Sequence, residues 1–124
     1  MGMFMDGIEK IEFQEGHVFF TEGDMNFFFF VLDEGKVEIY RETLKGNQHL
    51  DTVTEGQAFG EFALVSRQPR SATAKALTKG SAYKVSEENY KKLLEDLPGW
   101  AVSVIQGLVT RLKKTNEALA QHSF

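Results

Sequence analysis

The chain has 124 residues, and its 14 Lys and Arg against 18 Asp and Glu give a formal net charge of −4. This length suits one domain, which we expect to occupy residues 1–124. The chain has no Cys, which excludes disulfides, thiolate metal sites and Cys nucleophiles. No apolar run reaches about 18 residues, so no membrane-spanning helix is expected. The start, MGMFMDG, lacks the pattern of a signal peptide. These features fit a cytoplasmic protein.

The charge is unevenly distributed along the chain. Residues 1–62 hold 13 acidic and 4 basic side chains, whereas residues 63–124 hold 5 acidic and 10 basic ones. An anionic ligand would therefore prefer the second half, through its local field rather than through net charge. The basic residues form no stripe, and no recognition-helix or zinc-finger pattern is present, so we expect no nucleic-acid partner.

Short runs of β-forming residues, separated by turns, fill the first two thirds of the chain. The run at residues 27–32, FFFFVL, is typical of a strand that is buried on both faces or wrapped into a roll. A turn at Gly35 leads to a returning strand, and the two strands are predicted to form a hairpin. Strands are predicted at residues 11–13, 17–21, 27–32, 37–40, 50–53, 71–77 and 81–85. About seven or eight short strands at this spacing predict a mainly β protein with an antiparallel β-roll over about residues 11–85.

Two helices are predicted after the roll, over about residues 86–121. Ser86 is a suitable N-cap for the first helix, and Pro98-Gly99 ends it. The second helix begins at about Trp100, which we expect to pack in the core. Gly107 indicates a bend or a close contact in this helix. An apolar stripe follows at Ala101, Ile105, Leu108, Leu112 and Leu119. This stripe fits either a dimer seam or a helix packed on its own roll.

Residues 59–74, FGEFALVSRQPRSATA, combine features of an anion site. Gly60 lets the backbone approach a ligand, and a single helical turn at residues 62–65 offers free amides. Glu61 is an acceptor beside that turn, and Arg70 is a charged fork that suits phosphate. Such a set suits a ligand that is part phosphate and part sugar hydroxyl. The alternative is a surface loop with a structural ion pair between Glu61 and Arg70.

This stretch closely resembles the phosphate-binding cassette of the cyclic nucleotide-binding domain family. The matching residues are Phe59, Gly60, Glu61, Ala63, Leu64, Pro69, Arg70, Ser71, Ala72 and Thr73. The Gly23-Asp24 turn and the strands around Gly35 extend the resemblance to about residues 14–120. The chain departs from the family at residues 25–28, MNFF, where small or polar residues are usual. We expect Phe27 to fold inward rather than lie exposed on a loop tip.

The resemblance implies a small-molecule ligand, cAMP or cGMP, and no metal. Arg70 would pair with the cyclic phosphate, and Glu61 would accept from the ribose 2′-hydroxyl. Ser71, where cGMP-preferring members often have Thr, favours cAMP. The C-terminal helices would close over the bound ligand. The implied ligand-binding residues are Gly60, Glu61, Phe62, Ala63, Leu64, Arg70, Ser71 and Ala72.

The sequence argues against an enzyme. His17, His49 and His122 lack the close spacing of a metal site, and no Gly-x-Ser-x-Gly or Walker motif is present. We therefore expect a regulatory sensor module, with a homodimer or an effector protein as possible partners of its C-terminal helix. The alternative is a vestigial β-roll that contacts proteins without binding nucleotide.

Overall fold

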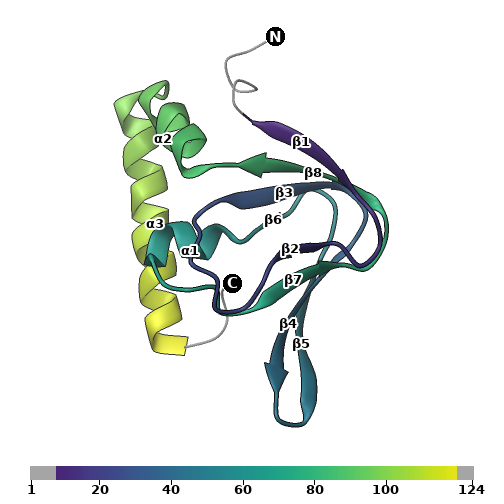
Figure 1. The fold of residues 1–124 in the computed structure, drawn as a ribbon. Coiled ribbons are helices and arrows are strands. Elements are labelled where there is room, and N and C mark those ends of the chain that lie inside the picture. The colour runs from purple at the N-terminus through teal and green to yellow at the C-terminus, as the bar shows by residue number, and fades with distance from the viewer. Residues whose placement is uncertain (1–7, 120–124) are drawn as a thin grey trace.

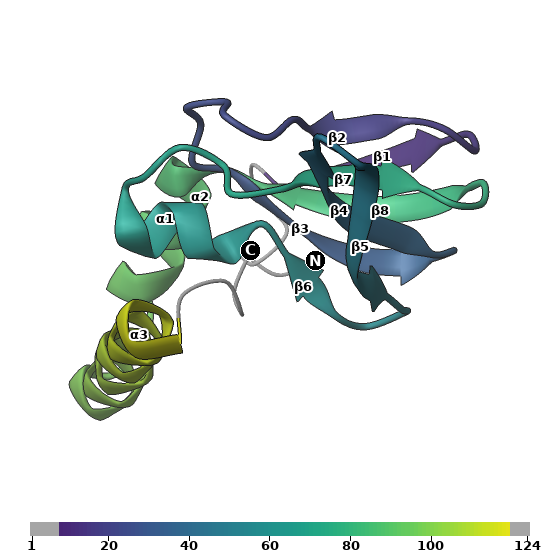
Figure 2. The same cartoon turned by 90° about the horizontal axis from the view of Figure 1, so that it is seen from below.

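The computed structural model describes residues 8–119, without the side chains of Val109 and residues 112–119. The described chain forms eight strands and three helices, with the helices gathered at one side of the strands (Figures 1 and 2). The strands are β1 (Glu9–Phe13), β2 (Val18–Phe20), β3 (Phe29–Glu34), β4 (Val37–Thr43), β5 (Gly46–Val53), β6 (Ala58–Phe59), β7 (Thr73–Ala76) and β8 (Gly80–Val85). The helices are α1 (Glu61–Ser66), α2 (Glu87–Glu95) and α3 (Gly99–Leu119).

The strands form two antiparallel four-stranded sheets. One sheet has the order β1-β8-β3-β6, and the other has the order β2-β7-β4-β5. Strands that are distant in sequence are therefore neighbours in space: β1 pairs with β8, and β2 pairs with β7. This arrangement confirms the predicted β-roll with C-terminal helices, and the number of strands agrees with the prediction. The predicted hairpin around Gly35 is wrong, because the turn carries the chain from one sheet to the other: β3 pairs with β6 and β8, whereas β4 pairs with β5 and β7.

Aromatic rings fill the space between the two sheets. The ring of Phe19 meets those of Phe13, Phe30 and Phe59 edge-on, with centroids 5.0–5.1 Å apart. Phe30 and Phe59 stack at 5.3 Å. Edge-to-face and offset arrangements of this kind are favoured by the ring quadrupoles, beyond the gain from burying apolar area. The cluster fixes β6, and with it the start of the segment that follows at Gly60.

The apolar run at residues 27–32 is wrapped into the roll, one of the two predicted arrangements, and is not buried on both faces. The strand β3 begins only at Phe29, and its burial alternates: Phe30 and Leu32 are buried, whereas Phe29 and Val31 are half-buried. The outer face of β3 is covered in part by α2, where the ring of Tyr90 meets that of Phe29. Phe27 and Phe28 take no part in the strand pairing and lie in the loop before β3.

The β4–β5 hairpin extends beyond the rest of the roll (Figure 1). The strand β5 begins at Gly46, four residues before the predicted start at residue 50. Residues 46–49 are exposed and polar, so hydrophobic alternation could not reveal them. The turn that joins β4 to β5 is closed by a hydrogen bond, in which Thr43 Oγ1 donates to the carbonyl of Gly46 at 2.6 Å.

The helices follow the local signals in the sequence. Ser86 caps α2, and its side chain and that of Asn89 form a reciprocal capping box. The break at Pro98-Gly99 separates α2 from α3 as predicted. The expectation for Trp100 was wrong: it is 73% exposed, because α3 lies beside α1 and α2 rather than on the sheets (Figure 2). The predicted close contact at Gly107 is not seen among the described residues, where a Cβ at this position would meet nothing within 4 Å. No helix in the described part of the chain is long and apolar enough to cross a membrane.

Candidate functional site

Gly60 is the junction between β6 and the cassette helix α1. Its backbone is left-handed, with φ of 85°, and the residue is buried. A Cβ at this position would lie 2.8 Å from the ring of Phe20 and 3.0 Å from Nη1 of Arg70. Glycine is therefore required here for two reasons, conformation and space. Within the described structure, the side chains of Phe20 and Arg70 occupy the space beside Gly60, and the predicted approach of a ligand to its backbone stays a prediction.

Arg70 is the most closely held side chain of the cassette. It is only 3% exposed, and each of its three nitrogens donates a hydrogen bond. Nε donates to Oδ1 of Asn26 at 2.7 Å, Nη1 donates to the carbonyl of Gly60 at 2.6 Å, and Nη2 donates to the carbonyl of Phe28. The guanidinium carbon lies 4.1 Å from the ring centroid of Phe20 and 5.3 Å from that of Phe28. The side chain is thus fixed in both position and plane.

The backbone of Arg70 is tied to the turn at Gly23-Asp24. The amide of Arg70 donates to the carbonyl of Asp24, and the amide of Gly23 donates to the carbonyl of Arg70, both at 2.8 Å. Oδ2 of Asp24 accepts from the amide of Thr21 at 3.0 Å and so shapes the turn. The Gly-Asp turn noted in the sequence therefore anchors the end of the cassette, about 46 residues further along the chain.

Glu61 begins α1 beside Arg70 and is partly buried. Burial raises the pKa of its carboxyl from 4.5 to about 7, although a backbone hydrogen bond and the charge of Arg70 act in the opposite direction. Burial likewise lowers the pKa of Arg70 to about 10, against the charges of Asp24 and Glu61. Among the described residues, the carboxylate of Glu61 and the guanidinium of Arg70 are more than 4.0 Å apart and so form no ion pair. The two charges therefore interact electrostatically over a longer distance. The alternative predicted from the sequence, a structural ion pair between Glu61 and Arg70, is not formed.

The other predicted site residues surround this pair. Ala63 and Ala72 are buried, whereas Phe62, Leu64 and Ser71 are half-buried. The carbonyl of Ser71 accepts from Nε of Arg41 at 3.1 Å. The predicted residues thus come from α1 and from the segment that enters β7, and the structure joins the two segments through the contact between Gly60 and Arg70.

Sequence reasoning missed Asn26, Phe20 and Phe28, which all contact the guanidinium. Residues 25–28 were treated only as a departure from the family pattern. A usable signal was present: Asn26 is a lone amide between Met25 and four consecutive phenylalanines, next to the Gly-Asp turn. A polar side chain in such surroundings needs a partner when it is buried.

Arg67 joins the cassette to two other parts of the molecule. It ends α1 with a left-handed backbone, φ 59°, which is unusual for a residue with a side chain. Its Nη1 lies 2.7 Å from Oε2 of Glu87 in α2, and its guanidinium lies over the ring of Phe27 at 4.3 Å. Phe27 is half-buried, in line with the prediction that it folds inward. The loop before β3, the cassette and α2 therefore meet at Arg67.

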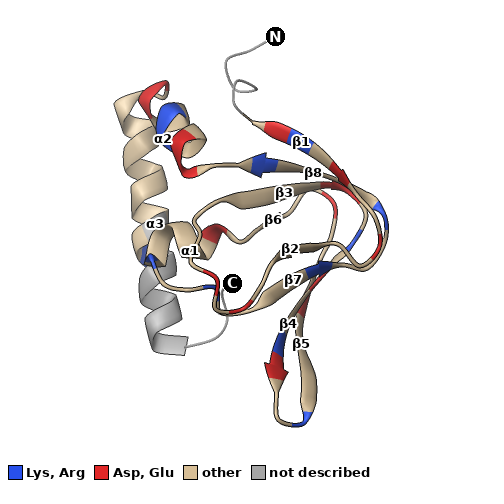
Figure 3. Ribbon diagram, viewed as in Figure 1, with Lys and Arg blue, Asp and Glu red and all other residues tan. Residues whose placement is uncertain are grey.

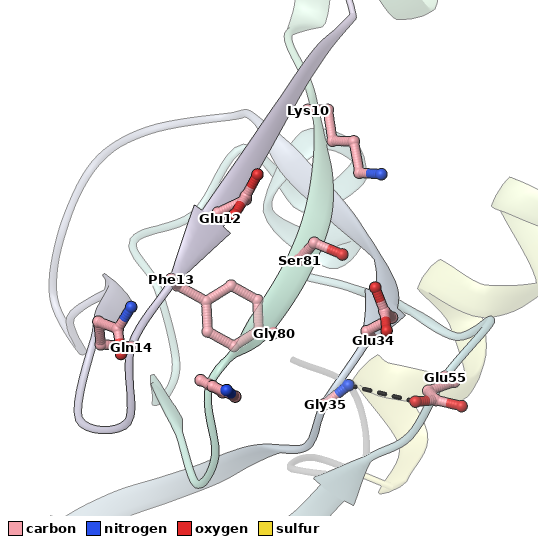
Figure 4. A pocket seen from close by; sticks show the side chains of 10 residues that line it. Lys10, Glu12, Phe13, Gln14, Glu34, Gly35, Glu55, Gly80 and Ser81 are labelled. Atoms are coloured by element: carbon pink, nitrogen blue, oxygen red, sulfur yellow. Dashed lines mark hydrogen bonds between the residues drawn. The ribbon is translucent and has the colours of Figure 1, made fainter.

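A separate groove lies at the far end of β3 (Figure 4). The strand begins beside the cassette, at Phe29, and ends at Glu34, where the groove of about 500 Å³ opens. Figure 4 shows Phe13, Gly80 and Ser81 on one side of it and Glu55 near Gly35, whose amide donates to the Glu55 carboxylate at 3.3 Å. None of the predicted ligand-binding residues lines this groove. Among the described residues, no group of three or more His, Asp or Glu side chains is arranged to hold a metal ion.

Comparison with known proteins agrees with this geometry. Residues 10–96 match the model of the cyclic nucleotide-binding domain. The chain is 27% identical over 118 residues to the CRP-like cAMP-activated global transcriptional regulator of Mycobacterium tuberculosis, covering 94% of this chain and 53% of that protein. The chain thus spans about half the length of this relative.

Two solved structures illustrate the shared fold. The EAL enzyme Bd1971 in its halfsite-occupied form matches with a TM-score of 0.80 and 25% identity, covering 89% of this chain and 99% of that chain. The catabolite activator protein of Thermus thermophilus matches with a TM-score of 0.74 and 26% identity, covering 94% and 55% of the two chains. The family model covers more than half of the chain and includes both Glu61 and Arg70. The chain therefore belongs to the cyclic nucleotide-binding domain family.

Proposed function

We propose that this domain binds a cyclic nucleotide, with cAMP preferred over cGMP, and acts as a regulatory module in the cytoplasm rather than as an enzyme. The observation that carries the proposal is the buried guanidinium of Arg70, held beside Glu61 without an ion pair. A buried cation whose hydrogen-bond partners are all neutral favours an anionic ligand, because the negative charge of the ligand offsets the solvation that the cation loses on burial. The Mycobacterium tuberculosis relative is described as cAMP-activated, and Bd1971 has cAMP-bound and cGMP-bound forms.

Each cassette residue has a role in this proposal. Arg70 pairs with the exocyclic oxygens of the cyclic phosphate, and Glu61 accepts from the ribose 2′-hydroxyl. Backbone amides from Gly60 to Ala63, and those of Ser71 and Ala72, surround the phosphate, while Leu64 packs at the base of the cassette. The Ser71 hydroxyl adds one contact. The preference for cAMP rests on Ser71 in the position that often holds Thr in cGMP-preferring members.

The signal passes to the C-terminal helices in our proposal. The cassette helix α1 is already joined to α2 through Arg67 and Glu87 and lies against α3. A ligand that draws α1 inward would therefore bias the positions of both helices, with the hinge at Pro98-Gly99. A ligand can shift this equilibrium only by its difference in affinity for the two arrangements.

Calorimetric titration with cAMP and cGMP tests the binding proposal. We expect a dissociation constant near micromolar or tighter for cAMP, about −8 kcal/mol, and a weaker one for cGMP. In the same samples, amide hydrogen exchange in residues 98–119 should slow when cAMP is added, because the closed helices are more protected. Unchanged exchange with saturating cAMP would reject closure. Absence of binding by folded, ligand-free protein would favour the vestigial roll as a protein-interaction module.

The exposed side of α3 fits a partner helix, and we propose a second copy of the chain. Trp100, Val104 and Leu108 are 73%, 55% and 58% exposed and follow one another at four-residue spacing. No charge interrupts residues 99–110, as the uncharged colour of this part of α3 in Figure 3 shows. The exposed apolar face of α3 therefore differs from the stripe predicted from the sequence. Of that stripe, Ala101 and Ile105 are half-buried, and Leu112 and Leu119 lie outside the described side chains.

Light scattering tests the dimer. We expect twice the monomer mass for the unchanged protein at micromolar concentration, and the monomer mass for Val104→Glu, because an unpaired charge cannot be buried in the seam. Ser103→Glu is the matched control, since Ser103 is an exposed neighbour on the same helix. A monomer at all concentrations would instead leave this surface to an effector protein.

A further inference from the structure

We propose that Asn26 is a positioning residue for nucleotide binding, and that its neutral amide orients the guanidinium of Arg70 without neutralising the positive charge. The inference rests on the proposed function, because it concerns how the cassette prepares its arginine for a phosphate. It adds to that function a residue from outside the cassette. Asn26 lies 44 positions before Arg70 in the sequence, in the stretch where the chain departs from its family.

The geometry shows how Arg70 is oriented. A guanidinium has five N–H groups on three nitrogens, and one acceptor is present for each nitrogen. Two acceptors are backbone carbonyls, of Gly60 and Phe28, which the fold itself places. The third is the Asn26 amide oxygen, at 2.7 Å from Nε. With the ring of Phe20 against one face, the plane of the fork is fixed before any ligand arrives, so that ligand binding need not order it.

The charges around Arg70 explain why an amide, and not a carboxylate, suits this position. Within the described part of the chain, no carboxylate comes within 4.0 Å of Arg70. The charged groups that face it are Asp24, whose Oδ2 is bound to the Thr21 amide, and Glu61, which is itself partly buried. The Arg70 side chain is only 3% exposed, so its cation is poorly solvated, and this burial lowers the pKa of Arg70. A phosphate placed against the remaining N–H groups would relieve that cost.

Two variants of Asn26 separate this role from a merely structural one. Asn26→Asp keeps the shape but adds an internal counter-charge at Nε, which should raise resistance to urea while weakening cAMP binding by about tenfold or more. Asn26→Ala removes the acceptor, which should lower resistance to urea and weaken cAMP binding by about threefold to tenfold. Both variants thus lose affinity, but their stabilities move in opposite directions. A structural role alone would make affinity follow stability.

The experiment is calorimetric titration of cAMP at pH 7.5, paired with urea unfolding, on the unchanged protein, both variants and Met25→Ala. Met25 is an adjacent residue with 62% exposure and serves as the control. If Asn26→Asp binds cAMP as tightly as the unchanged protein and Met25→Ala do, the inference is overturned while the proposed function stands. Tighter binding by Asn26→Ala would also overturn it, by showing that the amide competes with the ligand. If folded unchanged protein and Met25→Ala bind neither cAMP nor cGMP, the proposed function fails and the inference fails with it.

Discussion

Replacing Arg70 with Ala is expected to abolish detectable cyclic nucleotide binding and to lower the free energy of unfolding by about 2–4 kcal/mol. The loss of binding follows from removal of the phosphate partner. The loss of stability has a separate cause, because the carbonyls of Gly60 and Phe28 and the amide of Asn26 would lose their donor in a buried setting. The ring of Phe20 would also lose the group stacked on it. Calorimetry and urea unfolding measure the two effects independently.

Arg70→Lys is the informative companion to this variant. It keeps the positive charge, but a single ammonium cannot serve three acceptors in the plane of a fork. We expect it to fold with intermediate stability and to bind cAMP at least about tenfold more weakly than the unchanged protein. Lys75→Ala is the surface control, since Lys75 is an exposed residue of β7. Unchanged affinity in a folded Arg70→Ala protein would show that the ligand binds elsewhere.

Glu61→Gln is expected to stabilise the protein at pH 8 and to leave its stability unchanged near pH 4.5. Because burial raises the pKa of Glu61 from 4.5 to about 7, the folded protein binds this proton more tightly than the unfolded chain does. The penalty for the carboxylate is therefore absent below pH 4.5, grows as the pH rises to about 7, and is constant above that. Converting the shift gives up to about 3 kcal/mol at pH 8, which Gln would relieve.

Urea unfolding of both proteins at several pH values between 4.5 and 8 measures this difference. Glu9→Gln, a change at an exposed position of β1, provides the control and should show no comparable gain. The same Glu61→Gln protein should bind cAMP about tenfold more weakly, because a neutral amide is a poorer acceptor for the ribose hydroxyl than a carboxylate. A stability difference that is independent of pH would contradict the buried-carboxylate account.

Local signals predicted much of the fold. The turn at Gly35, the N-cap at Ser86 and the break at Pro98-Gly99 depend on residues close to one another in the chain, and the structure confirms all three. The exposed strand residues 46–49 were missed because polar side chains carry no burial pattern. Trp100 was misplaced because its environment is decided by where α3 lies, and that depends on α1 and α2 rather than on residues beside Trp100.

The candidate site divides in the same way. Gly60, Glu61 and Arg70 lie in one short segment of the chain, so the sequence could predict them together as a phosphate site. The residues that orient Arg70 were not predicted. Asn26 and Phe28 are 44 and 42 residues away in sequence, and the tertiary fold brings them to the guanidinium, in part through the backbone hydrogen bonds between Arg70 and the Gly23-Asp24 turn. The direction of the pKa shift of Glu61 also required the burial seen in the structure.

The mixture of acceptors around Arg70 has a consequence for evolution. Two of the three acceptors are main-chain carbonyls, which no substitution at residues 60 or 28 can delete while the backbone keeps its path. The acceptor at residue 26 is the only one of the three that is a side chain, so it alone can be altered by a point mutation. Natural variation at this position could therefore tune the sensitivity of such a domain to its ligand without altering Glu61, Arg70 or the core. If Asn26 has the proposed role, relatives that share Glu61 and Arg70 but differ in their affinity for cyclic nucleotide are expected to differ at residue 26.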